Sequence, residues 1–173
     1  VITNIPFFSK GNGDIASLDT WNSSRDGSGK RLPGFNYPGA TFHIQPGHIL
    51  QNNLNAFIPH LVIERNGVLI SSTGIKSNHL DVQGGGTYIQ TKEFPDIASL
   101  AQFTLRNGGS YIQKHDGIIP GNNKTFYSFS NVILNDYSAA TFATPVNWGN
   151  LVIDNSNSEN TDFLNCFRNI SGD

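Results

Sequence analysis

The stretch LDVQGGGTYIQ, residues Leu80–Gln90, recurs with the same pattern as FTLRNGGSYIQ at Phe103–Gln113. In both copies an alternating apolar segment leads to a polar residue and a glycine turn. A small residue, tyrosine, isoleucine and glutamine follow. Alternation with a period of two is the sequence signal of a strand, and a recurring unit of this length indicates stacked structural repeats. The pair therefore favours a repeat fold made of strands.

Further copies of the same template, apolar, any, apolar, polar, turn, lie on both sides of this pair. The six copies begin at Phe42, Leu61, Leu80, Phe103, Val132 and Leu151. Three of the five intervals between these positions are 19 residues. The fourth residue of each copy is polar, so that Glu64 and Arg106 are expected to face solvent. We predict one strand of this kind in each successive coil.

The expected fold is all-β, a right-handed parallel β-solenoid of about six coils. Side chains alternate between the two faces of a strand, so the first and third residues of every copy point inward together. The glycines then fall at one corner of each coil, where a side chain would obstruct the turn. Right-handedness is expected because parallel crossovers are almost always right-handed. An antiparallel β-sandwich or jelly roll is the alternative, since it also joins short alternating strands.

Two regions are expected along the chain. Residues 1–40 are rich in Gly, Asn, Asp and Ser, and they are interpreted as an N-terminal capping segment anchored by Trp21 and Phe35. Residues 41–173 form the solenoid, with residues 95–103 as an insertion that carries the helix signals. Since residue 1 is not Met, the chain is interpreted as a mature or excised piece. The solenoid is expected to continue beyond Asp173, where another coil would begin.

Composition excludes several classes of partner. Charged residues make up 14% of the chain, the net charge is -2 and the pI is about 6.2. Nucleic-acid binding is not expected, because it requires clustered Lys and Arg. No apolar run approaches the roughly 18 residues that suggest a membrane span.

Several phrases of the chain resemble the β-solenoid regions of large secreted surface or adhesin-like proteins of Bacteroidota. An opening G-x-G-D with T-W nearby is followed by a strand that ends in a G-H turn, and a W-G-N-L-x-I phrase comes late. The matching residues are Gly11, Gly13, Asp14, Thr20, Trp21, Gly47, His48, Trp148, Gly149, Asn150 and Leu151. The resemblance implies a secreted, extracellular cell-surface location and export by type IX secretion machinery. It implies no catalytic residue.

The chemistry-bearing residues do not form a recognisable active site or metal centre. His43 and His48 have opposite strand parity and lack further ligands, so no metal site is predicted, and His48 is interpreted as a turn residue that bonds backbone. Glu64 and Asp81 are isolated acids in separate outward columns, whereas the alternative function, a polysaccharide lyase or glycoside hydrolase, needs neighbouring carboxylates. The turns GNGD and RDGSG offer calcium ligands without regular D-x-D spacing, so no cofactor is predicted.

A column after the glycine corner is the candidate ligand-binding surface. Tyr88 and Tyr111 lie two residues after their turn glycines, and Gln90 and Gln113 follow them. If the tyrosines face outward, they form an aromatic stripe bordered by amides, which suits a glycan or a surface-protein partner. In the alternative, residues 91–102 fold over the stripe and make it ordinary core. The function predicted is therefore a non-enzymatic display segment with weak glycan or protein binding.

Overall fold

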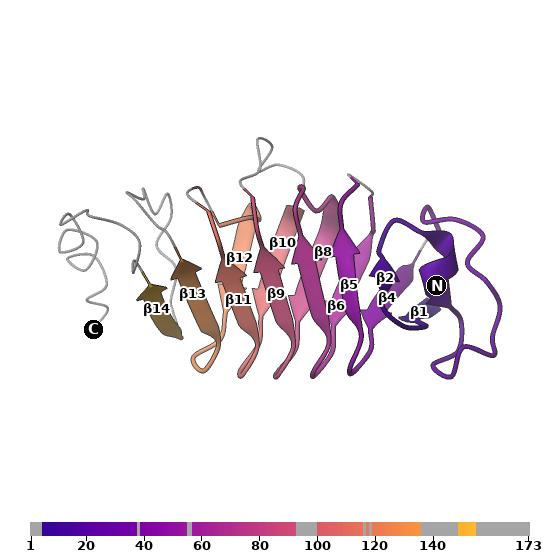
Figure 1. Cartoon of the computed structure of the whole chain (residues 1–173), viewed down its shortest axis with the longest axis horizontal. Helices are drawn as coiled ribbons and strands as arrows, with labels where there is room; N and C mark the ends of the chain where they lie inside the picture. Colours follow the sequence, from indigo (N-terminus) through magenta and orange to yellow (C-terminus); the bar gives the residue numbers. More distant parts are fainter. Residues whose placement is uncertain are drawn as a thin grey trace.

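The chain is described from a computed structural model that describes residues 5–37, 39–54, 57–92, 100–115, 117, 119–135 and 149–154. Sheet A contains, in spatial order, β12 (Asn123–Phe126), β10 (Leu100–Leu105), β8 (Ser77–Val82), β6 (His60–Ile63), β4 (Ala40–Ile44), β1 (Ile5–Ser9) and β3 (Trp21–Asn22). Sheet B contains β14 (Asn150–Asp154), β13 (Asn131–Asn135), β11 (Ser110–Gln113), β9 (Thr87–Gln90), β7 (Val68–Ser71), β5 (Ile49–Asn52) and β2 (Gly13–Asp14). A short 3-10 turn, η1 (Leu18–Thr20), precedes β3. Figure 1 shows the two sheets as facing layers along the long axis.

The chain alternates between the sheets, so each turn adds one parallel strand to each of them. About four successive turns are each made of one strand from sheet A and one from sheet B. These pairs are β4 with β5, β6 with β7, β8 with β9, and β10 with β11. The predicted all-β parallel β-solenoid is confirmed, whereas the count of about six coils is not. Among the described strands, only β1 and β3 pair antiparallel, which excludes the sandwich or jelly roll. None of the described helical segments is long and apolar enough to cross a membrane.

The predicted repeat register is right for four copies and wrong for two. The copies at Phe42, Leu61, Leu80 and Phe103 lie side by side in sheet A. Those at Val132 and Leu151 lie in sheet B, where Val132 pairs with Tyr111 and Leu151 with Val132. The strand that follows Phe103 in sheet A is instead β12, in which Lys124 pairs with Phe103. Lys124 stands where the repeat has an apolar inward residue, so the sequence of β12 does not match the repeat pattern.

Apolar columns from both sheets fill the interior. Ile63 and Leu105 are fully buried, as their inward register predicts. The inward column of sheet A that contains Phe42 is continued by Leu61, Leu80 and Phe103, and all four are 0% exposed. Every coil therefore buries side chains against the coil before and after it, which is how a solenoid is stabilised.

The corners between the two sheets are joined by a ladder of backbone hydrogen bonds. The N–H of Gly47 donates to the carbonyl of Asn66, the N–H of Asn66 to Gly85, and the N–H of Gly85 to Gly108, at 2.8–3.0 Å. All four residues have φ between 62° and 80°. Asn66 fills the one step without glycine, because asparagine tolerates the left-handed region better than most residues. The glycine corner predicted for each coil is present at these turns.

The opening segment supplies strands to both sheets rather than standing apart from them. β1 pairs in parallel with β4, and β2 pairs in parallel with β5. Both predicted anchors contact Phe42, with ring centroids at 5.1 Å for Trp21 and 5.7 Å for Phe35. The opening segment and the first turn therefore share the same two sheets. Of the expected helical insertion, residues 100–103 form part of β10, and residues 95–99 lie outside the described residues, as do residues 155–173.

Candidate functional site

The predicted ligand-binding residues lie in the interior. Tyr88, Tyr111, Gln90 and Gln113 are each 0% exposed. The expected outward aromatic stripe is therefore wrong, and these side chains present no surface to a ligand. The two tyrosines do lie together, with ring centroids 5.3 Å apart, and both rings meet Phe103 edge-on. The repeated phrase encodes a stacked core.

Tyr88 and Tyr111 were expected to face outward because the residues after them, Ile89 and Ile112, are aliphatic and suit an inward position. Gly47 occupies the corner position of Asn66, and not that of Gly67, so Leu50 pairs with Leu69 and both point inward. Ile70, Ile89 and Ile112, whose aliphatic character suggested an inward position, instead belong to the outward column of sheet B. The column continues through Ile133 and Val152, for which an outward position was expected. A shift of one residue moves every side chain of a strand to the other face.

The buried glutamines satisfy polar backbone in the loops that leave sheet B. Nε2 of Gln113 donates to the carbonyls of His115 and Gly117, at 3.1 and 2.8 Å. Nε2 of Gln90 donates to the carbonyl of Lys92 at 3.2 Å. The buried amide nitrogens of the glutamines need such acceptors, because an unpaired buried donor costs about 1–3 kcal/mol. In both copies of the repeated stretch, the side chain of the final glutamine therefore holds the loop that follows by hydrogen bonds to its backbone.

Burial also removes these tyrosines from acid–base chemistry. The pKa of Tyr88 is raised by burial, and interaction with the Ser71 side chain only partly opposes this. A phenol of this kind stays protonated across the physiological range. Tyr88 is therefore buried in the core and remains a neutral phenol.

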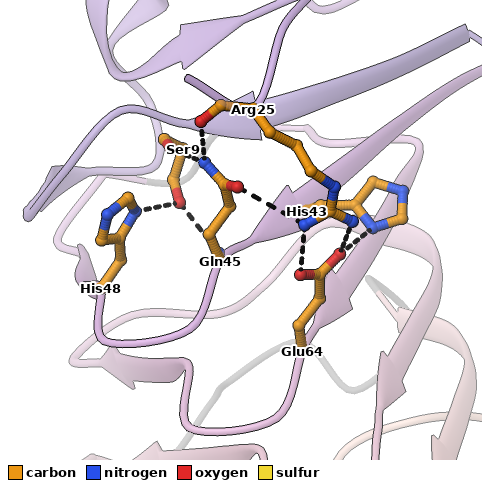
Figure 2. A network of polar contacts seen from close by, with 6 residues as sticks. All are labelled: Ser9, Arg25, His43, Gln45, His48 and Glu64. Atoms are coloured by element: carbon orange, nitrogen blue, oxygen red, sulfur yellow. Dashed lines mark hydrogen bonds and ion pairs between the residues drawn. The ribbon is translucent and has the colours of Figure 1, made fainter. Parts of the chain in front are cut away.

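A polar cluster on the outer face of sheet A joins the opening segment to the second turn (Figure 2). Glu64, which follows β6, accepts two hydrogen bonds from Arg25, Nη1 to Oε2 at 2.8 Å and Nη2 to Oε1 at 2.6 Å. Nδ1 of His43 lies 2.9 Å from the same Oε1. The Arg25 guanidinium also lies 4.4 Å from the centre of the Phe8 ring. Bidentate contacts of this type are strong and directional.

The other half of this cluster holds β1 to the first corner (Figure 2). The Ser9 hydroxyl accepts from the N–H of Gln45 at 2.9 Å and lies 2.7 Å from Nδ1 of His48. Nε2 of Gln45 donates to the carbonyls of Ser9 and Arg25, at 2.7 and 2.8 Å. His48 was expected to bond backbone at the corner, and its ring contacts this hydroxyl instead. We name Ser9, Arg25, His43, Gln45, His48 and Glu64 the clamp.

The second outward carboxylate is also paired with an arginine. Asp81 on β8 accepts from Nε of Arg106 at 2.8 and 3.0 Å and from Nη2 at 2.8 Å. Asp81 is 5% exposed, and Glu64 is 8% exposed. The expectation that Glu64 faces open solvent is wrong. Arg106 is exposed as expected, yet it neutralises a buried carboxylate.

The electrostatics of Glu64 favour a permanently ionised, hydrogen-bonded carboxylate. Burial acts to raise its pKa, but the hydrogen bonds and charge of Arg25, together with His43, outweigh burial, and the pKa is lowered overall. A general acid needs the opposite shift, toward neutral pH. The geometry of this carboxylate suits an ion pair that fastens two segments of chain.

The acidic turns serve local backbone structure. Oδ1 of Asp14 accepts from the N–H of Ala16 at 2.7 Å, and Oδ1 of Asp26 accepts from the N–H and hydroxyl of Ser28. The hydroxyl of Ser28, followed by its N–H, lowers the pKa of Asp26. In the described part of the chain, no three His, Cys, Asp or Glu residues gather as a group that could hold a metal ion.

Sequence reasoning missed Ser9 and Arg25. Both belong to the opening segment, and their partners Gln45 and Glu64 lie 36 and 39 positions further along. Contacts of this separation leave no local spacing signal. In comparisons with known proteins, no family model, no curated protein and no solved structure matches this chain.

Proposed function

We propose that this chain is a non-enzymatic structural and display segment of a secreted cell-surface or adhesin-like protein, capped at its N-terminal end by residues 1–40. The observation that carries the proposal is the condition of the outward carboxylates. Glu64 and Asp81 are each bound bidentately by an arginine. Carboxylates held in this way link neighbouring segments and leave little capacity for acid–base work.

The capping role is supported by how the opening segment meets the end of sheet A. β3 pairs antiparallel with β1, at Phe8 with Asn22 and Ser9 with Trp21. A short antiparallel strand covers the edge that β1 would otherwise offer to another chain. The indole of Trp21 is fully buried, and its Nε1 donates to the carbonyl of Ile15 at 2.9 Å.

The secreted location and type IX export are proposed from the resemblance of the sequence to solenoid regions of Bacteroidota surface proteins. Protease treatment of intact cells that produce the natural protein tests the location. Loss of the protein without cell lysis is expected. Protection of the protein until lysis would contradict the surface location.

Activity on polysaccharides tests the non-enzymatic role against the lyase or hydrolase alternative. The purified chain is incubated with acidic and neutral polysaccharides, and new reducing ends and unsaturated products are measured. No turnover is expected. Turnover that disappears in Glu64→Gln or Asp81→Asn, but persists in the same-column control Gln83→Ala, would overturn the proposal, provided that circular dichroism shows all variants folded.

A further inference from the structure

Two histidines stack on the outer face of sheet A, one turn apart. His60 on β6 and His79 on β8 are paired positions in the parallel register. Their ring centroids are 4.6 Å apart, and the ring planes differ by 14°. The parallel β-sheet thus holds two imidazoles face to face.

The two rings have different hydrogen-bond environments. Nε2 of His79 lies 2.9 Å from Oγ1 of Thr104 on the next strand. Nε2 of His60 is buried and has no hydrogen-bond partner among the residues that the structure describes. A proton added to this nitrogen would create a buried charge without an acceptor, which is unfavourable.

Charged groups of both signs face the pair from the neighbouring strands. His43 lies on β4, Asp81 on β8 beside His79, and Arg106 directly after β10. The carboxylate of Asp81 favours protonation of the rings, but it is already held by Arg106. Glu64, on the same face, is likewise engaged by Arg25 and His43. Neither carboxylate is therefore available as a dedicated counter-ion.

We propose that His60 and His79 form an acid-sensitive contact. The stacked rings stabilise the pairing of β6 with β8 at neutral pH, and this pairing weakens under mild acid. Protonation of both rings would place like charges on directly opposed cross-strand positions. Such pairs are destabilising in a sheet. Separation of the rings relieves the repulsion and gives Nε2 of His60 access to water.

The direction of the pH response follows from the environment of the rings. Burial, followed by the charge of His79, lowers the pKa of His60, although Asp81 opposes this. Burial also lowers the pKa of His79, again against Asp81. The unfolded chain takes up these protons near pH 6.5, while the folded chain remains neutral. The stability contribution is therefore complete above about pH 6.5 and is lost as the pH falls through that value toward the lowered folded pKa.

Hydrogen exchange of the whole chain at pH 7.5 and 5.5, corrected for the intrinsic rate, tests the proposal. Amides of β6 and β8 are expected to lose protection by up to about tenfold for each histidine whose folded pKa is lowered, because pH 5.5 lies about one unit below the ordinary pKa. His79→Asn should reduce this loss, because it removes one titrating ring and the repulsion between the rings, and His79→Phe, which keeps a stacked ring without a titratable nitrogen, should do so as well. The control Gln83→Ala removes no titratable group and should respond to pH as the parent does.

Titration of the imidazole Cε1–H signals by NMR supplies an independent readout. Both rings are expected to titrate below the ordinary pKa, and His60 should move upward in His79→Phe. The proposal is overturned if both rings titrate at the ordinary value. It is also overturned if a folded His79→Asn or His79→Phe chain loses protection at pH 5.5 to the same extent as the parent.

Discussion

The phenol oxygen of Tyr111 lies 2.7 Å from Oε1 of Gln90 on the preceding turn and 2.9 Å from Oε1 of Gln113 on its own strand. Through this hydroxyl the ring contacts both of the glutamine amides that hydrogen-bond to the loops. Because the site is buried, Tyr111→Phe is expected to lower the free energy of unfolding by about 1 kcal/mol. Urea denaturation measures the loss. Tyr127→Phe, at a tyrosine that is 43% exposed, is the control and should be nearly neutral.

A matched pair of neighbours on β7 tests which face of sheet B is inside. Leu69 is fully buried, whereas Ile70 belongs to the outward column. Leu69→Asp is expected to cost several kcal/mol and to prevent folding, because it buries an unpaired carboxylate. Ile70→Asp should cost less than about 1 kcal/mol. Equal losses of melting temperature in the two variants would show that the register of β7 is wrong.

The pairing of Arg106 with Asp81 predicts that an exposed residue is important for stability. Arg106→Ala leaves the carboxylate of Asp81 buried without its partner, so a loss of about 1–3 kcal/mol is expected. Asp81→Ala added to this variant should recover part of the loss, since the unpaired charge is then gone. Thermal unfolding of the parent, the single variants and the double variant gives the comparison. A loss that the second substitution only deepens would argue against this explanation.

Removal of the opening segment tests its role as a cap. Deletion of residues 1–38 exposes the edge of β4 and the apolar surface of Phe42, so the shortened chain is expected to aggregate. Trp21→Ser removes a fully buried indole and should act in the same direction. Size-exclusion chromatography with light scattering measures the mass. A monomer that melts at the parent's temperature would refute the cap.

The repeat fold could be predicted from the sequence because stacked coils require similar residues at equivalent positions. Phe42, Leu61, Leu80 and Phe103 share one inward column, and the spacing of their strands identified it. The method failed where the template itself changes. Lys124 occupies the next inward position, so β12 was missed and strands of sheet B were taken for the last two copies.

The candidate site was less predictable because it depends on small shifts and on distant contacts. The aliphatic residues Ile70, Ile89 and Ile112 favoured the wrong inward face for β7, β9 and β11, which placed Tyr88 and Tyr111 at the surface. Arg25 comes from a loop whose composition indicates only a turn. Its contact with Glu64 depends on how the opening segment folds back across His43, which no local pattern encodes.

The ion pair between Arg25 and Glu64, which is part of the clamp, allows the most direct test of whether the outward carboxylates have a structural role. A double-mutant cycle with Arg25→Ala, Glu64→Gln and their combination, followed by urea denaturation, isolates the coupling between the two side chains. Because Arg25 is about half exposed, with 54% of its side chain accessible, a coupling of about 1–2 kcal/mol is expected rather than that of a fully buried pair. Coupling within error of zero, with each single variant as stable as the parent, would contradict the account.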